Sequence, residues 1–245
     1  MKTSILSIFL LSLIVISARA QNSNLPKIPS LGEIAPSFDA NSTMGKIKYP
    51  DNYYNKWRII VSHPGAFTPV CTSEIIELAY LQEDFKNLKT EIIVISTDGV
   101  NSNLEWIKSM EEMTYKERKT PQITFPIISD LGLEISRKYG MQHKNISNTK
   151  NVRGVFIIDP DNRIRIIQFY PLNIGRNFEE LKRVLIALQE ADKKNVLTPA
   201  NWNPGDDYLL NSPSSQDEFE RIKNMKKADE YYLAWYMWFR KNKSK

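Results

Sequence analysis

Short apolar runs alternate with amphipathic stretches along most of this chain. Buried strands are predicted where apolar residues run together, at 57–61, 92–96, 125–128, 152–158 and 164–170. Helices are predicted where apolar positions recur at three- and four-residue spacing, at 74–88, 101–113, 133–139 and 178–192. The polar run 159–163 separates the last two strands and predicts a tight hairpin turn. This order predicts an α/β layered fold with a mixed central sheet flanked by helices.

The two ends of the chain differ from this central part. Residues 1–20 combine a charged start at Lys2, an apolar run and the small-x-small sequence Ala18-Arg19-Ala20, which together predict a signal peptide cleaved after Ala20. We therefore expect an exported protein, periplasmic or secreted, with no stable membrane insertion after cleavage because the apolar run is short for a span. Residues 21–30 are polar and contain proline, which predicts a flexible mature N-terminus.

The composition changes again near residue 198, so we expect one domain over 31–197 and a C-terminal extension over 198–245. Loop-forming residues come first, and 217–245 is predicted as a helix. Its residues 231–239 are too aromatic for a fully solvated tail. We expect them to pack on the domain or on a partner subunit, with a membrane or ligand surface as the alternative.

Composition excludes several classes of protein. With 245 residues, 42% of them hydrophobic, the chain is large enough for a real core, and its formal charge of +5 does not argue for nucleic-acid binding. One cysteine cannot form an internal disulfide, so Cys71 either pairs with another molecule or stays free for chemistry. One cysteine and two unclustered histidines, His63 and His143, predict no metal site, and no cofactor is expected.

Cys71 lies where a predicted strand passes into a predicted helix. Thr68 or Thr72 can cap that helix, whose first backbone N–H groups are unpaired and whose dipole places partial positive charge near the sulfur. These features favour the thiolate, the nucleophilic form of cysteine. The alternative is a buried, inert thiol, which spacing alone does not exclude.

The residues around Cys71 resemble a known active-site signature. Pro64-x-x-x-Thr68-x-x-Cys71 followed by Glu74 resembles the signature of the peroxiredoxins, and His63-Pro64 with 67–71 resembles their 1-Cys, peroxiredoxin-6-type subgroup. Further matches follow in the family's order, at 31–32, 35–38, 125–130, 139–141, 153–160, 170–171 and 175–178. The resemblance covers roughly residues 31–206 and implies a thioredoxin-like fold and a homodimer. The aromatic end of the chain does not match the family's C-terminal extension.

The resemblance also implies roles for individual residues. Cys71 would be the peroxidatic cysteine. Thr68 and Arg153 would contact peroxide and sulfur, and Pro64 would shield the thiolate from water. His63 would modulate the thiolate environment or the route to the reductant, and Glu74 and Arg176 would help orient the active-site arginine. A purely structural role is the alternative for two of these residues. Glu74 would be a favourable charge in the first turn of a helix, and Arg176 would be a residue at a helix start that donates to nearby carbonyls.

The sequence thus predicts a thiol-dependent peroxidase that reduces hydrogen peroxide and small organic hydroperoxides. Cys71 would be oxidised to sulfenic acid and, since the chain has no second cysteine, reduced by an external thiol of unknown identity. One alternative is a redox-insensitive chaperone or binding protein on a peroxiredoxin scaffold. Another is a cysteine hydrolase that uses Cys71 and His63.

Overall fold

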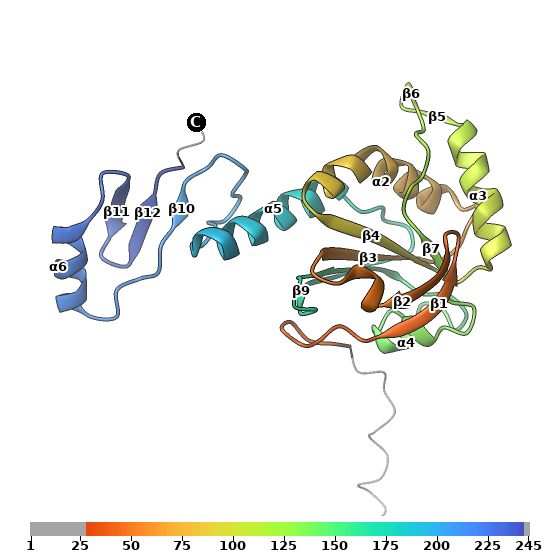
Figure 1. Cartoon of the computed structure of the whole chain (residues 1–245), viewed down its shortest axis with the longest axis horizontal. Coiled ribbons are helices and arrows are strands. Elements are labelled where there is room, and N and C mark those ends of the chain that lie inside the picture. Colours follow the sequence, from red (N-terminus) through yellow and green to blue (C-terminus); the bar gives the residue numbers. More distant parts are fainter. Residues whose placement is uncertain (1–27, 243–245) are drawn as a thin grey trace, which may run out of the picture.

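The computed structural model describes residues 28–242, so the predicted leader and most of the flexible segment 21–30 lie outside the described residues. Its centre is a seven-stranded sheet of strand order β2-β1-β7-β4-β3-β8-β9 (Figure 1). The strands of this sheet are β1 (Phe38–Ser42), β2 (Gly45–Tyr49), β3 (Trp57–His63), β4 (Thr90–Ser96), β7 (Ile127–Ser129), β8 (Arg153–Ile158) and β9 (Ile164–Tyr170).

Helices cover both faces of this sheet (Figure 1). The helices of the domain are η1 (Asp51–Tyr53), α2 (Pro69–Asn87), α3 (Val100–Glu112), α4 (Glu134–Lys138) and α5 (Phe178–Lys194). One buried cluster joins α2, α3 and α5 to Ile59 and Val61 of β3. A second cluster joins α4 and the β1–β2 hairpin to Ile60 of the same strand. The central strands are therefore apolar on both faces, which explains their continuous apolar runs.

Strand pairing brings two loops together at one edge of the sheet. β3, β4 and β7 are parallel, whereas β8 runs antiparallel to β3 and β9 antiparallel to β8. The β3–β4 register pairs Trp57 with Thr90 at one end and His63 with Ser96 at the other. The chain segments that follow His63 and Ser96 consequently leave the sheet side by side.

The predicted mixed α/β fold is confirmed, and Ile164–Tyr170 forms β9 with the predicted bounds. Helix α2 begins at Pro69, five residues before the predicted start, so Cys71 lies inside its first turn. Strands β1 and β2 were not predicted, since they are short and their outer positions are polar. A small hairpin of β5 (Thr114–Tyr115) and β6 (Arg118–Lys119) also follows α3.

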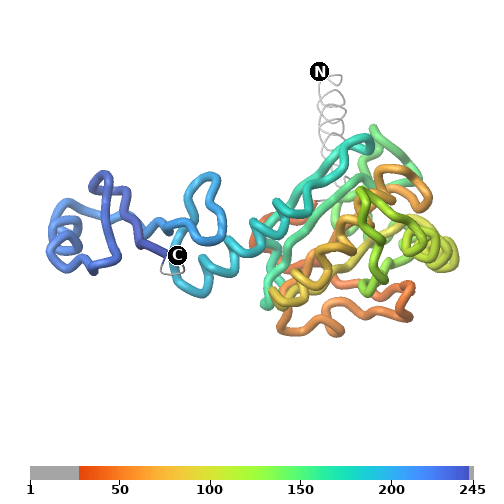
Figure 2. The backbone as a smooth tube through the Cα atoms, turned by 90° about the horizontal axis from the view of Figure 1, so that it is seen from above, coloured from red at the N-terminus to blue at the C-terminus, as the bar shows by residue number. Residues whose placement is uncertain are grey.

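The C-terminal extension stands at one end of the molecule, beyond α5 (Figures 1 and 2). It contains β10 (Tyr208–Leu209), α6 (Gln216–Met225), β11 (Glu230–Ala234) and β12 (Met237–Arg240), with the three strands in the order β10-β12-β11. It joins the domain through a cluster in which Trp202 and Tyr208 pack against Ala187 of α5 and against Val196.

The prediction of a helix over 217–245 is wrong, because α6 ends at Met225 and a β-hairpin follows. The aromatic residues pair across this hairpin: the rings of Tyr231 and Phe239 stack at 4.9 Å, and those of Tyr232 and Trp238 lie 4.8 Å apart. Aromatic side chains favour pleated strands and stabilise one another across them. Among the described residues, no helix combines the length and apolar character needed to span a membrane.

Candidate active site

Cys71 is the third residue of α2, one loop beyond the end of β3. The first hydrogen bond of the helix runs from the Thr72 N–H to the Thr68 carbonyl, so the N–H groups of Val70 and Cys71 precede the helical ladder. Partial positive charge from these groups and from the helix dipole therefore lies beside the sulfur. The Cys71 side chain has 0% exposed surface.

Thr68 is the N-cap residue of α2, as one of the two alternatives predicted, but neither threonine makes a side-chain capping hydrogen bond. The Thr68 hydroxyl donates to the Gly65 carbonyl at 2.9 Å. The Thr72 hydroxyl donates to the Thr68 carbonyl at 2.8 Å and accepts the indole N–H of Trp106 at 3.1 Å. Both hydroxyls thus fix the loop before Cys71, since each donates its proton to a loop carbonyl.

Arg153 lies against the sulfur. Its Nη1 donates to Cys71 Sγ at 3.3 Å and to Glu74 Oε2 at 2.6 Å. Its Nε and Nη2 donate to the Leu172 carbonyl at 3.0 and 2.7 Å. The guanidinium comes from the start of β8, and the antiparallel pairing of β8 with β3 places it beneath the first turn of α2. Contacts on three sides leave the Arg153 side chain little freedom to turn.

Glu74 joins this arginine to a second one. The N–H and Nε of Arg176 donate to Glu74 Oε1, both at 2.9 Å, and its Nη2 donates to Oε2 at 2.7 Å. Arg176 Nη1 also donates to the carbonyls of Ser62 and Gly154. Arg176 therefore makes the contacts expected for both roles: it binds Glu74, and it donates to backbone carbonyls. Burial lowers the pKa of Arg176, and the adjacent Glu74 carboxylate opposes that shift.

The charges of this buried cluster do not cancel without the sulfur. Arg153, Arg176 and Glu74 are all buried, and two guanidinium groups face one carboxylate. An uncompensated charge in a protein interior is costly. A thiolate at Cys71 supplies the missing negative charge 3.3 Å from Arg153, so the cluster favours an anionic sulfur.

His63 is fully buried at the end of β3, with its ring 4.9 Å from that of Trp106. Neither ring nitrogen has a hydrogen-bond partner of normal geometry among the described residues. Burial, reinforced by the positive charges of Arg176 and Arg153, lowers the pKa of His63 to about 3. His63 is therefore neutral at ordinary pH, and no hydrogen bond joins it to Cys71 within residues 28–242. The contact that the hydrolase alternative needs is thus missing from this part of the chain.

The loop between β3 and α2 is held by residues that the sequence did not single out. Pro64 is buried, and its carbonyl accepts the Thr97 hydroxyl at 3.1 Å. The Asp98 carboxylate accepts the Ala66 N–H at 2.6 Å. Thr97 and Asp98 directly follow β4, the parallel neighbour of β3, and that adjacency is the signal by which they could have been found.

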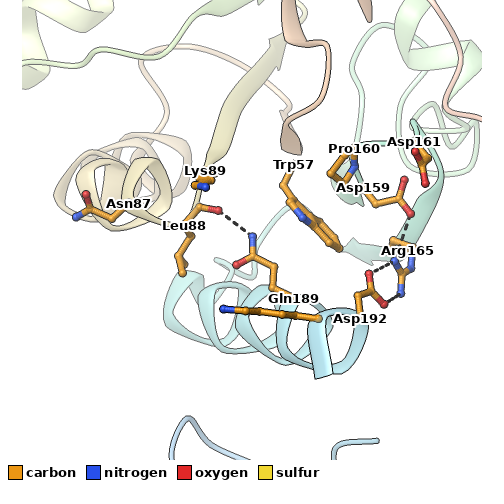
Figure 3. Close-up of a pocket in the computed structure, with 11 residues that line it drawn as sticks. Trp57, Asn87, Leu88, Lys89, Asp159, Pro160, Asp161, Arg165, Gln189 and Asp192 are labelled. Carbon is orange, nitrogen blue, oxygen red and sulfur yellow. Dashed lines mark hydrogen bonds and ion pairs between the residues drawn. The ribbon is translucent and has the colours of Figure 1, made fainter. Parts of the chain in front are cut away.

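No second candidate for a catalytic centre stands out elsewhere among residues 28–242. The described residues hold no group of three or more histidine, cysteine, aspartate or glutamate side chains that could bind a metal. His143 lies in a loop, its ring 5.1 Å from that of Phe169. A hollow of about 630 Å³ is lined in part by Trp57, Arg165 and Asp192 (Figure 3). It opens at the far end of β3, about 20 Å from His63 at the usual strand rise.

Comparisons with known proteins agree with this geometry. The AhpC/TSA family matches residues 31–167, and the C-terminal domain of 1-Cys peroxiredoxin matches residues 187–227. A peroxiredoxin of Methanosarcina mazei is 44% identical over 219 residues, which cover 89% of this chain and 100% of the relative. Peroxiredoxin 2 of Picrophilus torridus is 43% identical over 81% of this chain and 95% of its own length.

Solved structures give the same result. A yeast mitochondrial 1-Cys peroxiredoxin superposes with a TM-score of 0.77 at 36% identity, covering 88% of this chain and 100% of that chain. Peroxiredoxin 6 of Arenicola marina superposes with a TM-score of 0.76 at 33% identity, with the same coverage of both chains. The AhpC/TSA match at residues 31–167 includes α2, which carries Cys71 and Glu74, and β8, which carries Arg153.

Proposed function

The chain belongs to the AhpC/TSA family and is a 1-Cys peroxiredoxin, a thiol peroxidase, and from this premise we propose that Cys71 is its peroxidatic cysteine. The observation that carries the proposal is the 3.3 Å contact between Arg153 Nη1 and Cys71 Sγ inside a buried cluster that lacks one negative charge. The sulfur is thereby prepared as a nucleophile, and the donor that prepares it is fixed in place.

The reaction divides into an oxidation and a reduction. The thiolate attacks one oxygen of a hydroperoxide: an S–O bond forms as the O–O bond breaks, sulfur loses two electrons, and the leaving alkoxide or hydroxide takes up a proton. One external thiol then displaces water from the sulfenic acid and forms a mixed disulfide. A second thiol attacks that disulfide, which releases the external disulfide and restores Cys71.

Arg153 is the group best placed to stabilise the first transition state. Four of its five N–H groups are occupied by Cys71, Glu74 and Leu172, which leaves one N–H on Nη2 for a peroxide oxygen. The Thr68 oxygen, whose proton goes to Gly65, can accept from the peroxide O–H. The free N–H groups of Val70 and Cys71 add donors where negative charge develops.

Access to the sulfur requires movement. Cys71 has no exposed surface, so even a molecule the size of water reaches Sγ only when neighbouring side chains shift. The reductant is proposed to be a small thiol or a dithiol protein. The yeast relative supports this choice, because its structure is described in terms of thiol resolution by the glutathione and thioredoxin systems.

Trapping the sulfenic acid tests this assignment. The reduced protein is mixed with one equivalent of hydrogen peroxide and dimedone, and intact mass is measured within seconds. We expect stoichiometric labelling that is absent in Cys71→Ser and strongly slowed in Arg153→Ala. Arg165→Ala is the matched control, because Arg165 is also ion-paired but lies at the other end of the sheet. Thiol-dependent peroxide turnover by Cys71→Ser would refute the proposal.

We further propose a homodimer formed through β9. This strand is the last of the seven-stranded sheet and pairs with β8 on one side only, so much of its outer edge is open among the described residues. An open edge is a template for pairing with a second chain. Light scattering should give twice the chain mass at micromolar concentration, and a monomer there would contradict the dimer.

Export is proposed from the leader sequence alone. N-terminal sequencing of the protein from its native host should begin at Gln21. Recovery of the chain from the cytoplasm with Met1 or Lys2 in place would contradict export.

A further inference from the structure

Two consecutive residues after β4 bind the loop between β3 and α2. The Thr97 hydroxyl donates to the Pro64 carbonyl at 3.1 Å, and the Asp98 carboxylate accepts the Ala66 N–H at 2.6 Å. Pro64 and Ala66 are the two neighbours of Gly65, so these contacts hold the peptide units on both sides of that glycine. Glycine has more backbone freedom than any other residue. The point at which the loop could turn most easily is therefore fixed from the neighbouring strand.

Asp98 is itself held by buried groups. Its N–H donates to the Ser96 hydroxyl at 3.1 Å, and its carbonyl accepts a side-chain N–H of Asn103 at 3.3 Å. The Ser96 hydroxyl donates in turn to Asn103 Oδ1 at 3.0 Å, and both side chains are 0% exposed. Ser96 ends β4, and Asn103 lies near the start of α3. The position of Asp98 is thus set by the sheet and by α3, and not by the loop that it binds.

One peptide unit joins Asp98 to Thr68. The Gly65 carbonyl accepts the Thr68 hydroxyl at 2.9 Å, and this carbonyl belongs to the same peptide unit as the Ala66 N–H that Asp98 binds. A planar peptide cannot turn its carbonyl without turning its N–H. Asp98 therefore fixes the direction in which the Thr68 hydroxyl finds its acceptor. A charged acceptor at the N–H also polarises the peptide and strengthens the bond at its carbonyl.

We propose that Asp98 is a positioning residue for the peroxide reaction and acts on Thr68 through this peptide. A hydroxyl has one hydrogen, and the Thr68 hydrogen is directed to the Gly65 carbonyl. The Thr68 oxygen then presents only lone pairs to the site, which is what the O–H of a hydroperoxide needs. Once Asp98 is removed, the peptide is free to turn, and the Thr68 hydrogen competes with the peroxide hydrogen for the same space. This role rests on the proposed function of Cys71 as the peroxidatic cysteine.

The role is separate from activation of the sulfur. Within residues 28–242, Asp98 makes no hydrogen bond to Cys71 or to Arg153, and the thiolate is stabilised by Arg153 and the helix start. Loss of Asp98 should therefore leave the thiolate in place and remove an acceptor that only a hydroperoxide uses. This difference distinguishes a positioning residue from one that merely supports the fold.

Two reactions of Cys71 show the difference. Hydrogen peroxide needs the thiolate and an acceptor for its own proton, whereas iodoacetamide needs the thiolate alone. Asp98→Ala should lower the rate constant for oxidation by hydrogen peroxide at least about tenfold and change that for alkylation by iodoacetamide less than about twofold. Asp98→Asn keeps the shape of the side chain and a neutral acceptor, so its oxidation rate should lie between those of the wild type and Asp98→Ala. It also carries the test if Asp98→Ala does not fold.

Glu111 provides the matched control. This carboxylate of α3 accepts the Ile123 N–H at 2.8 Å, so it makes the same kind of contact with a loop outside the site. Glu111→Ala should leave both rate constants of Cys71 unchanged. Intact mass with dimedone measures the oxidation, and intact mass without dimedone measures the alkylation.

A double-mutant cycle tests the route through Thr68. Thr68→Val removes the hydroxyl, so Asp98→Ala should slow oxidation less than about twofold in that background. The same loss in both backgrounds would overturn the proposal, as would equal slowing of both reactions in Asp98→Ala or an equal effect of Glu111→Ala. A wild-type chain that forms no dimedone adduct at Cys71 would refute the peroxidase assignment and this role with it. A labelled wild type and an equally fast Asp98→Ala would refute the role of Asp98 alone.

Discussion

Replacing Glu74 by glutamine tests the charge balance of the buried cluster most directly. The carboxylate accepts four hydrogen bonds, one from Arg153 and three from Arg176, and all three side chains are buried. Glutamine keeps the shape but removes the carboxylate charge, so that only the Cys71 sulfur is left to balance two buried guanidinium groups. Removing one partner of a buried ion pair costs about 3–5 kcal/mol. That is a large share of the roughly 5–15 kcal/mol by which domains are stable.

The same substitution should slow the oxidation of Cys71 by peroxide, because Arg153 loses the carboxylate that orients its Nη1 toward the sulfur. Loss of one aligned donor lowers rates by about 100-fold or more. Stability would be measured by urea unfolding, and the oxidation rate of Cys71 by stopped flow with stoichiometric peroxide. Glu77→Gln is the control: Glu77 lies on the same helix and also binds two cations, Lys116 and Arg118, but at the surface. It should cost at most about 1 kcal/mol. A Glu74→Gln protein as stable and as fast as Glu77→Gln would refute the argument.

Three further outcomes are expected. The pKa of His63 is about 3 in the folded protein against 6.5 in the unfolded chain, so the unfolded state binds more protons between these values. Stability should therefore fall by about 1.4 kcal/mol for each pH unit below 6.5, and a His63→Gln series in urea at pH 7 to 4.5 should lose that part of the slope. A slope unchanged by the substitution would contradict the assignment. Gly140→Ala should lower the free energy of unfolding by about 1–3 kcal/mol, because φ is +64° and a Cβ would come within 2.5 Å of Ile28. Gly45→Ala, with φ of +90° but open space, should cost less, and equal costs would show that the Ile28 contact does not matter. Oxidation of Cys71 to the neutral sulfenic acid should speed hydrogen exchange in the first turn of α2, since the cluster regains an uncompensated positive charge; unchanged exchange would argue against it.

Much of the fold could be predicted from the sequence because its central strands are buried on both faces. Continuous apolar runs such as those of β3 and β4 have few alternatives to a central parallel strand. Cys71, Glu74, Arg153 and Arg176 were named through family resemblance, and the structure brings all four together. Spacing alone could not have done this, since Arg153 lies on β8 and Arg176 in the loop before α5, both far from Cys71 in sequence.

The remaining features of the fold and the site depend on contacts that a single sequence does not show. The sequence predicts a helix where β11 and β12 form a hairpin, because the aromatic residues show no clear period of two and their stacking arises only between the two paired strands. Leu172 contributes a backbone carbonyl, which no side-chain pattern signals. The neutral state of His63 follows from its burial beside two arginines that are distant in sequence.

The two halves of the catalytic cycle require different exposure of Cys71. Enclosure keeps Arg153 dry and aligned during oxidation, yet the second half of the cycle needs another thiol to reach the sulfur. The charge balance offers a way to satisfy both demands. With a thiolate, the two arginines, Glu74 and the sulfur sum to zero, and the closed arrangement is favoured. When the sulfur becomes a neutral sulfenic acid, one positive charge is left uncompensated in a buried position, and hydration of that charge favours opening. The chemical step itself would then expose the sulfur to its reductant, without a second cysteine in the chain.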